Sequence, residues 1–138
     1  MTIFQQQLAM SGLILFALGL INGFMIPKTP HPRLALSAHL TAVQSGTFLI
    51  AMAWMWPMFS LSDQISALIA WMLIASLFLL WFAILMSAFW GAGRDLPIAA
   101  QGAVASAVKQ NIATALLYLS SVVSFLTLLF LIAVWVIY

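Results

Sequence analysis

Residues 64–93 read QISALIAWMLIASLFLLWFAILMSAFWGAG, thirty residues without a charged side chain. A helix needs about 20 apolar residues to cross the hydrocarbon core of a bilayer, so this stretch is long enough to span a membrane. Three more uncharged stretches occupy residues 3–26, 34–62 and 110–138. In lipid each backbone N–H and C=O must be paired within its own segment, which favours a helix for every stretch. The sequence therefore predicts an all-α integral membrane four-helix bundle formed by a single transmembrane domain, residues 1–138. The expected spans are about 5–25, 34–56, 64–90 and 107–137.

The overall composition supports a membrane protein. The chain has 138 residues, of which 66% are hydrophobic and 4% charged, and its mean hydropathy is +1.20. Soluble domains carry roughly 25% charged residues, so this chain cannot cover a soluble surface, and membrane lipid is its expected partner. A formal net charge of +2 is too small for a nucleic-acid interface. The absence of cysteine excludes disulfides, thiolate zinc sites, iron–sulfur clusters and covalently attached c-type haem.

The basic residues predict an orientation. Lys28 and Arg33 lie in the first connection between spans, and Arg94 and Lys109 lie in or beside the third. The opposite side of the membrane, with the second connection and both termini, carries no Lys or Arg. The positive-inside rule places the first and third connections in the cytoplasm and both termini outside. We expect a multi-pass protein of the bacterial inner (cell) membrane.

Polar groups inside the spans narrow the possible functions. No Asp, Glu, Lys or Arg falls within a span, which disfavours a proton-coupled multidrug carrier because such carriers need an intramembrane carboxylate. His39 is the one imidazole embedded in a span, roughly 8 Å from the expected end of its helix. An imidazole there either hydrogen-bonds a neighbouring helix or serves as an axial ligand to haem iron.

The residues around His39 leave two interpretations open. Ala35, Ala38, Ala42 and Gly46 form a small-residue strip that permits close approach of another helix or of a flat ligand. Arg33 lies roughly 9 Å from His39 along the helix axis, at the distance of haem propionates from the iron. Arg33, with Lys28 or Arg94, would then hold the propionates at the membrane surface. Alternatively, these basic residues only anchor the topology.

Other polar and aromatic side chains are weaker candidates. His31, between two prolines, is expected to be a solvated loop residue unless it folds back to form a bis-His pair. Gln44 and Ser45 follow His39 on the same helix. The fourth span carries a polar stripe that either bonds neighbouring helices or lines a substrate pocket: Asn111, Thr114, Tyr118 and Ser121. The third span is rich in aromatic residues, either for lipid packing or as a wall for an aromatic ligand.

Two segments of the chain resemble a known family. Residues 32–40 read PRLALSAHL and continue to SGTFLIA at 45–51 and Trp56-Pro57, a pattern similar to the second helix of the hydroxylaminobenzene mutases. Residues 88–93 read AFWGAG and are followed by LPIAA at 96–100, which resembles the end of the third helix and the next loop in that family. These mutases are small four-helix membrane proteins related to styrene oxide isomerase.

The resemblance implies a homotrimer that holds haem b between protomers, with His39 as the axial metal ligand. Ferric iron then acts as a Lewis acid toward a small aromatic substrate, an aryl hydroxylamine or an aryl epoxide, and the reaction is an isomerisation. Within this interpretation Ser45, Gln44 and Tyr118 are the candidate catalytic residues. Arg33, Lys28, Arg94 and Gly46 are the candidate cofactor-binding residues.

The chain also departs from the family pattern. Ser45 stands where relatives tend to have Asn, and Phe78 and Leu80 stand where they tend to have Tyr and Asn. Fewer hydrogen-bonding groups near a substrate would weaken its orientation. The alternative function is therefore a non-catalytic accessory subunit of a membrane complex, with or without haem.

Overall fold

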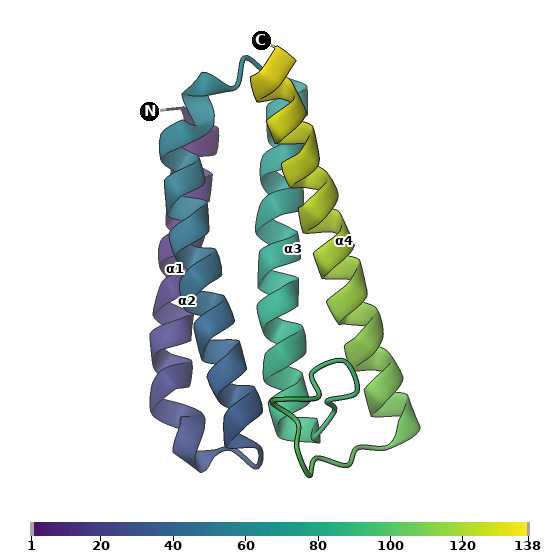
Figure 1. Ribbon diagram of the computed structural model, residues 1–138. Helices are drawn as coiled ribbons and strands as arrows, with labels where there is room; N and C mark the ends of the chain where they lie inside the picture. The colour runs from purple at the N-terminus through teal and green to yellow at the C-terminus, as the bar shows by residue number, and fades with distance from the viewer. Residues whose placement is uncertain (1, 138) are drawn as a thin grey trace.

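The computed structural model describes residues 2–137 and consists of four long helices joined by short connections (Figure 1). They are α1 (Ile3–Met25), α2 (Pro32–Met55), α3 (Asp63–Trp90) and α4 (Ala107–Ile137). Each is long and apolar enough to cross a bilayer, and each end lies within two residues of its predicted position. The protein is an all-α, multi-pass membrane protein.

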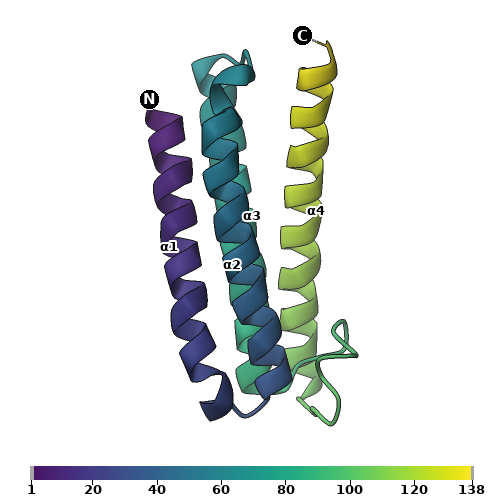
Figure 2. The same cartoon turned by 60° about the vertical axis from the view of Figure 1, so that its left-hand side comes forward.

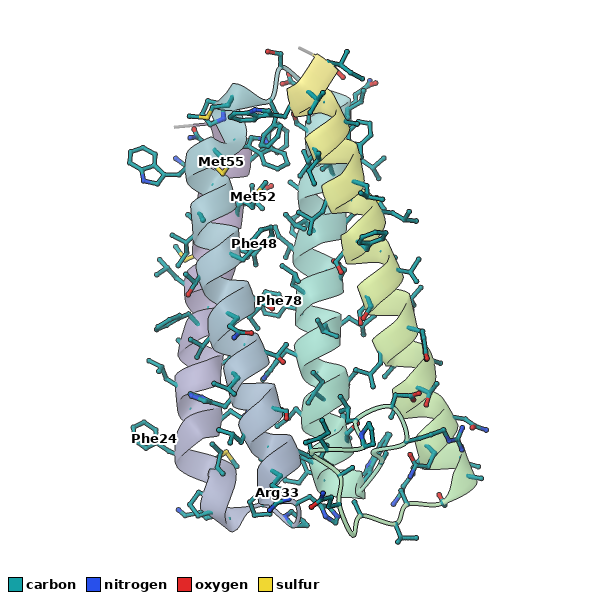
Figure 3. All side chains as sticks on the ribbon, in the orientation of Figure 1. Phe24, Arg33, Phe48, Met52, Met55 and Phe78 are labelled. Atoms are coloured by element: carbon teal, nitrogen blue, oxygen red, sulfur yellow. The ribbon has the colours of Figure 1, made fainter. Side chains whose placement is uncertain are left out.

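The four helices run up and down and pack as two pairs. α1 lies mainly against α2, and α4 lies mainly against α3. The pairs meet where α2 faces α3, which a view turned by 60° also shows (Figure 2). Phe48 of α2 and Phe78 of α3 project into the space between these helices (Figure 3). α2 and α3 are consequently the two helices through which the pairs mainly meet.

Local sequence signals begin and end these helices. The Thr2 side chain accepts a bond from the Gln5 amide, and the Gln5 side chain accepts one from the Thr2 amide, which caps the start of α1. Two short 3-10 turns, η1 (Ile26–Lys28) and η2 (Trp56–Met58), follow α1 and α2 and each contain a proline. Gly91 ends α3 with a φ of 69°, a conformation that glycine adopts at little cost.

Glycines let α1 and α2 touch backbone to backbone. A Cβ added at Gly12 would lie 2.7 Å from the Gly46 oxygen, and one added at Gly46 would lie 2.6 Å from the Phe16 nitrogen. A Cβ at Gly19 would lie 2.9 Å from the Ala42 Cβ. The predicted small-residue strip on α2 thus receives another helix, α1, in this structure.

One end of the bundle holds all the basic residues. Lys28, Arg33, Arg94 and Lys109 lie where α1 and α3 end and α2 and α4 begin, hereafter the basic end. The connection 91–106 folds there into successive turns, with Leu96 N–H bonded to the Gly93 oxygen and Ala100 N–H to the Leu96 oxygen. Two of its apolar side chains, Ile98 and Val104, are almost fully exposed. An interfacial position suits such a segment, which is polar in its backbone and apolar in its side chains.

Candidate functional site

His39 lies on the α1 side of α2, about 10 Å along the helix from Pro32 at the basic end. Its ring is partly buried, and Nδ1 is 2.7 Å from the carbonyl oxygen of Gly19 in α1. A carbonyl oxygen can only accept, so Nδ1 carries the proton and donates it. In the neutral form of the ring, Nε2 then keeps a lone pair. His39 thus bonds a neighbouring helix, as one interpretation expected, and retains one nitrogen that can bind a metal.

Gly23 provides the space for this ring. A Cβ added at Gly23 would lie 3.0 Å from Nδ1 and 3.1 Å from Cε1 of His39. Gly19 and Gly23 do not stand out in the sequence as residues of a site. The signal that could have found them is their spacing of four residues, which places both on one face of α1.

The residues around His39 fit a metal that brings most of its own ligands. Within residues 2–137 no group of three His, Cys, Asp or Glu side chains is positioned to hold an ion. Haem iron is a metal that a single protein histidine can hold. The free Nε2 of a hydrogen-bonded imidazole is the donor that haem iron takes.

His31 lies apart from His39, beside the end of α3. Its ring is partly buried against the end of α3, where a Cβ added at Gly91 would lie 2.7 Å from its Nε2. His31 thus lies in the loop before α2, as expected, and its ring is only partly exposed because it packs beside Gly91. His31 turns toward α3 whereas His39 turns toward α1, so the two rings do not form a pair within this chain.

Two of the basic candidates, Arg33 and Lys28, lie on the α2 side of the basic end. Arg33 is exposed and donates from Nη1 to Oε1 of Gln101 at 2.7 Å. It also lines a cavity of about 610 Å³ whose other walls are α2 and the connection: Leu36, Ser37, Asp95, Leu96, Pro97, Ile98 and Ala99. Lys28 is exposed in η1. Arg33 and Lys28 accordingly present positive charge at the membrane surface on the side of α2.

Arg94 lies on the α4 side of the basic end. Its guanidinium donates to Oδ1 of Asn111 at 2.9 Å, and its backbone N–H donates to Oε1 of Gln110. The Thr114 hydroxyl donates to the Asp95 carboxylate. The first two members of the predicted polar stripe on α4 therefore hold the connection 91–106 in place.

The candidate catalytic residues do not meet His39 within one chain. Ser45 follows His39 by six residues, and at about 100° per residue the two side chains leave α2 roughly 120° apart. Ser45 is buried, whereas Gln44 is exposed. Tyr118 is 60% exposed on α4, which packs on α3 rather than on α2. Gly46 is buried against α1. In the single chain His39 is the one candidate beside α1 with a free ligand atom.

The aromatic residues of α3 fall into two groups. Trp71, Phe82 and Phe89 are exposed, as lipid-facing or interface residues would be. Phe78 and Trp81 are partly buried and pack on the core that the two helix pairs share. The indole N–H of Trp81 is buried without an acceptor among residues 2–137. Only this second group has the position of an internal apolar wall.

A separate apolar cavity of about 300 Å³ lies at the opposite end of the bundle. Its lining comes from α2, the residue that follows η2, and α4: Met52, Met55, Phe59, Leu128, Leu131, Ile132, Trp135 and Val136. None of these side chains can transfer a proton at neutral pH, and their acceptors are only the weak thioether sulfurs of the two methionines. Its lining therefore provides no acid or base comparable to an imidazole.

Sequence comparisons relate this chain to known proteins. The family model described as "Styrene oxide isomerase" matches residues 4–136. Hydroxylaminobenzene mutase HabB of Ectopseudomonas oleovorans is 40% identical over 117 residues, which cover 83% of this chain and 71% of that protein. Hydroxylaminobenzene mutase HabA of the same organism is 36% identical over 115 residues, 83% of this chain and 85% of that protein. The protein therefore belongs to the styrene oxide isomerase family, whose members are isomerases and mutases.

Proposed function

We propose that this protein is a haem b-dependent membrane isomerase that rearranges a small aromatic substrate, an aryl hydroxylamine or an aryl epoxide. The observation that carries the proposal is the His39 ring, whose Nδ1 is bonded to the Gly19 carbonyl, which leaves Nε2 as the nitrogen that can bind iron. The named relatives support the substrate classes, since one is called a mutase of hydroxylaminobenzene and the family is called styrene oxide isomerase. The reaction is an isomerisation, so it needs no partner that supplies or removes electrons.

In such a site, different residues of this chain would have different roles. His39 would hold the iron through Nε2, and Arg33 and Lys28, with Arg94, would hold the propionates. When bound, ferric haem supplies a Lewis acid that draws electron density from the oxygen or nitrogen of the substrate. The apolar spans exclude water, which strengthens that polarisation and prevents hydrolysis of a reactive substrate.

A complete site on this proposal is shared between protomers. His39 and Ser45 leave α2 on different sides, so one flat ligand cannot touch both residues of the same chain. Gln44 and Tyr118 are exposed in the single chain and become available to a neighbour across an interface. A homotrimer satisfies both conditions if His39 of one protomer and Ser45 of the next face the same substrate. Ser45 then orients the reacting group through its hydroxyl.

Optical spectra of the purified, haem-supplied protein test this proposal. We expect a Soret band that is lost in His39→Ala and retained in His31→Ala, because His39 lies within a membrane span whereas His31 lies in the loop before α2. Product analysis with phenylhydroxylamine and with styrene oxide then measures turnover. A well-folded protein that shows no Soret band after haem is supplied contradicts the proposal.

An accessory, non-catalytic role is the second candidate, and one observation favours it. Phe78 and Leu80, at positions where relatives tend to have hydrogen-bonding residues, are apolar side chains of α3. A haem-bearing protein that turns over neither substrate would fit this role. Turnover of either substrate, lost in His39→Ala, would exclude it.

A further inference from the structure

We infer that α1 positions the His39 ring through Gly19 and Gly23, so that in the neutral ring Nδ1 carries the proton and Nε2 is the free nitrogen. The functional meaning of this inference rests on the proposed ligation of haem by His39. The geometry itself concerns only residues of this chain and can be measured without haem.

The Gly19 carbonyl has the capacity for this bond. Within α1 it accepts the regular helix bond from the amide of Gly23, four residues later. A carbonyl oxygen has two lone pairs, so the second is available to Nδ1 of His39 at 2.7 Å. The same oxygen therefore serves both the helix and the imidazole.

Gly23 keeps this carbonyl accessible. Side chains four residues apart in a helix lie one above the other, so a side chain at position 23 would stand beside the Gly19 carbonyl. A methyl group there would come within 3.0 Å of Nδ1, closer than ordinary contact between such atoms allows. The ring would have to move away from Gly19, and the hydrogen bond would lengthen or break.

Two further contacts hold α1 and α2 together on either side of His39. One turn before His39, Asn22 donates from Nδ2 to the Ala35 oxygen at 3.2 Å. One turn after it, Gly19 lies against Ala42, since an added Cβ would be 2.9 Å from the Ala42 Cβ. The Gly19 carbonyl is thus held in place, and the ring has a rigid partner.

As a consequence, the tautomer in which Nε2 is free to bind a metal is selected even when no metal is bound. A neutral imidazole exchanges between two tautomers unless a hydrogen bond selects one. A carbonyl that accepts from Nδ1 also raises the basicity of Nε2 toward iron, and loss of such a partner typically weakens metal binding 10–100-fold. Gly19 and Gly23 are therefore positioning residues for the metal ligand.

Nitrogen NMR of the tautomers tests the inference. The full chain, labelled with ¹⁵N-histidine, is placed without haem in lipid nanodiscs at mildly alkaline pH, and His31→Gln assigns the two rings. We expect wild-type His39 to be protonated at Nδ1. Gly23→Ala should produce a mixture of tautomers and weaken haem binding by roughly 10–100-fold.

Gly12→Ala is the matched control. It adds the same methyl group to the same α1–α2 contact, but eleven residues from Gly23, or roughly 16 Å along α1. It should loosen the helix pair and leave the His39 tautomer unchanged. An equal change of tautomer in both variants would show that Gly23 acts only through packing and would overturn the inference.

The wild-type spectrum alone also tests the inference, even if Gly23→Ala fails to fold, because it shows which nitrogen of His39 carries the proton. Protonation of His39 at Nε2 would overturn the inference. Protonation at Nδ1 in a chain that never binds haem would support it, and would contradict the proposed function separately.

Discussion

Two features of the structure disfavour a side chain at Gly91. Its φ of 69° disfavours any side chain, and a Cβ there would meet Nε2 of His31 at 2.7 Å. Gly102 has a φ of 78°, but a Cβ there would meet nothing within 4 Å. We expect Gly102→Ala to lower the free energy of unfolding by about 1–2 kcal/mol, the cost of the left-handed conformation. Gly91→Ala should cost more, because the contact with His31 is added.

Thermal unfolding in detergent measures this difference. Adding His31→Ala to Gly91→Ala should remove the extra cost and leave the conformational cost, since the two residues are in contact. Equal stabilities of the Gly91→Ala and Gly102→Ala variants would contradict the packing of His31 against α3.

The residue scale also shows what could be predicted from the sequence. His39 could be found because a polar imidazole is rare among apolar residues, and its two interpretations both followed from its chemistry. The two prolines that flank His31 predict its loop position, but they do not predict the side on which its ring packs. Gly19 and Gly23 were missed because their role depends on which face of α1 meets α2. Nearly uniform hydrophobicity along α1 hides that face.

At the scale of elements, the α1–α2 pair depends on the glycine contact at Gly12 and Gly46. Gly46→Ala places a methyl group 2.6 Å from a backbone nitrogen of α1, which cannot give way as a flexible side chain can. We expect it to lower the free energy of unfolding by about 1–3 kcal/mol through overpacking. Ala51→Val, on the exposed face of the same helix, should change it by less than about 0.5 kcal/mol. Similar melting temperatures for the two variants would contradict the observed crossing.

The helices themselves were predictable to within two residues because charges, prolines and one glycine mark their ends. The pairing of α1 with α2 was open, since the strip on α2 suits a helix or a flat ligand equally well. In the structure the strip on α2 packs against α1, because Gly12 supplies the complementary surface on α1.

For the whole molecule, the clustering of basic residues predicts that the basic end lies in the cytoplasm. The chain has no cysteine, so single cysteines can report on each side of the membrane. We expect a membrane-impermeant maleimide to label Ser60→Cys in intact cells and Ser106→Cys only after the membrane is opened. Both serines are exposed, and they lie at opposite ends of the bundle. The reverse labelling pattern would contradict the predicted orientation.

The site is less predictable than the fold, and helix geometry explains why. Ser45 and His39 are six residues apart and leave α2 on different sides, so a sequence motif that contains both does not describe one pocket in one chain. On our proposal a neighbouring protomer completes the site. A single sequence contains the residues of such a site but not the arrangement of the copies.

The proposed haem-dependent function depends most on His39 as the protein ligand of haem iron. The most direct test is the optical spectrum of His39→Gly, titrated with free imidazole in the presence of haem, with circular dichroism as the control for folding. We predict that the Soret band of the bound pigment is lost in this variant and returns as imidazole fills the space left by the ring. A Soret band that is unchanged by the substitution would contradict the account, because some other group would then hold the iron.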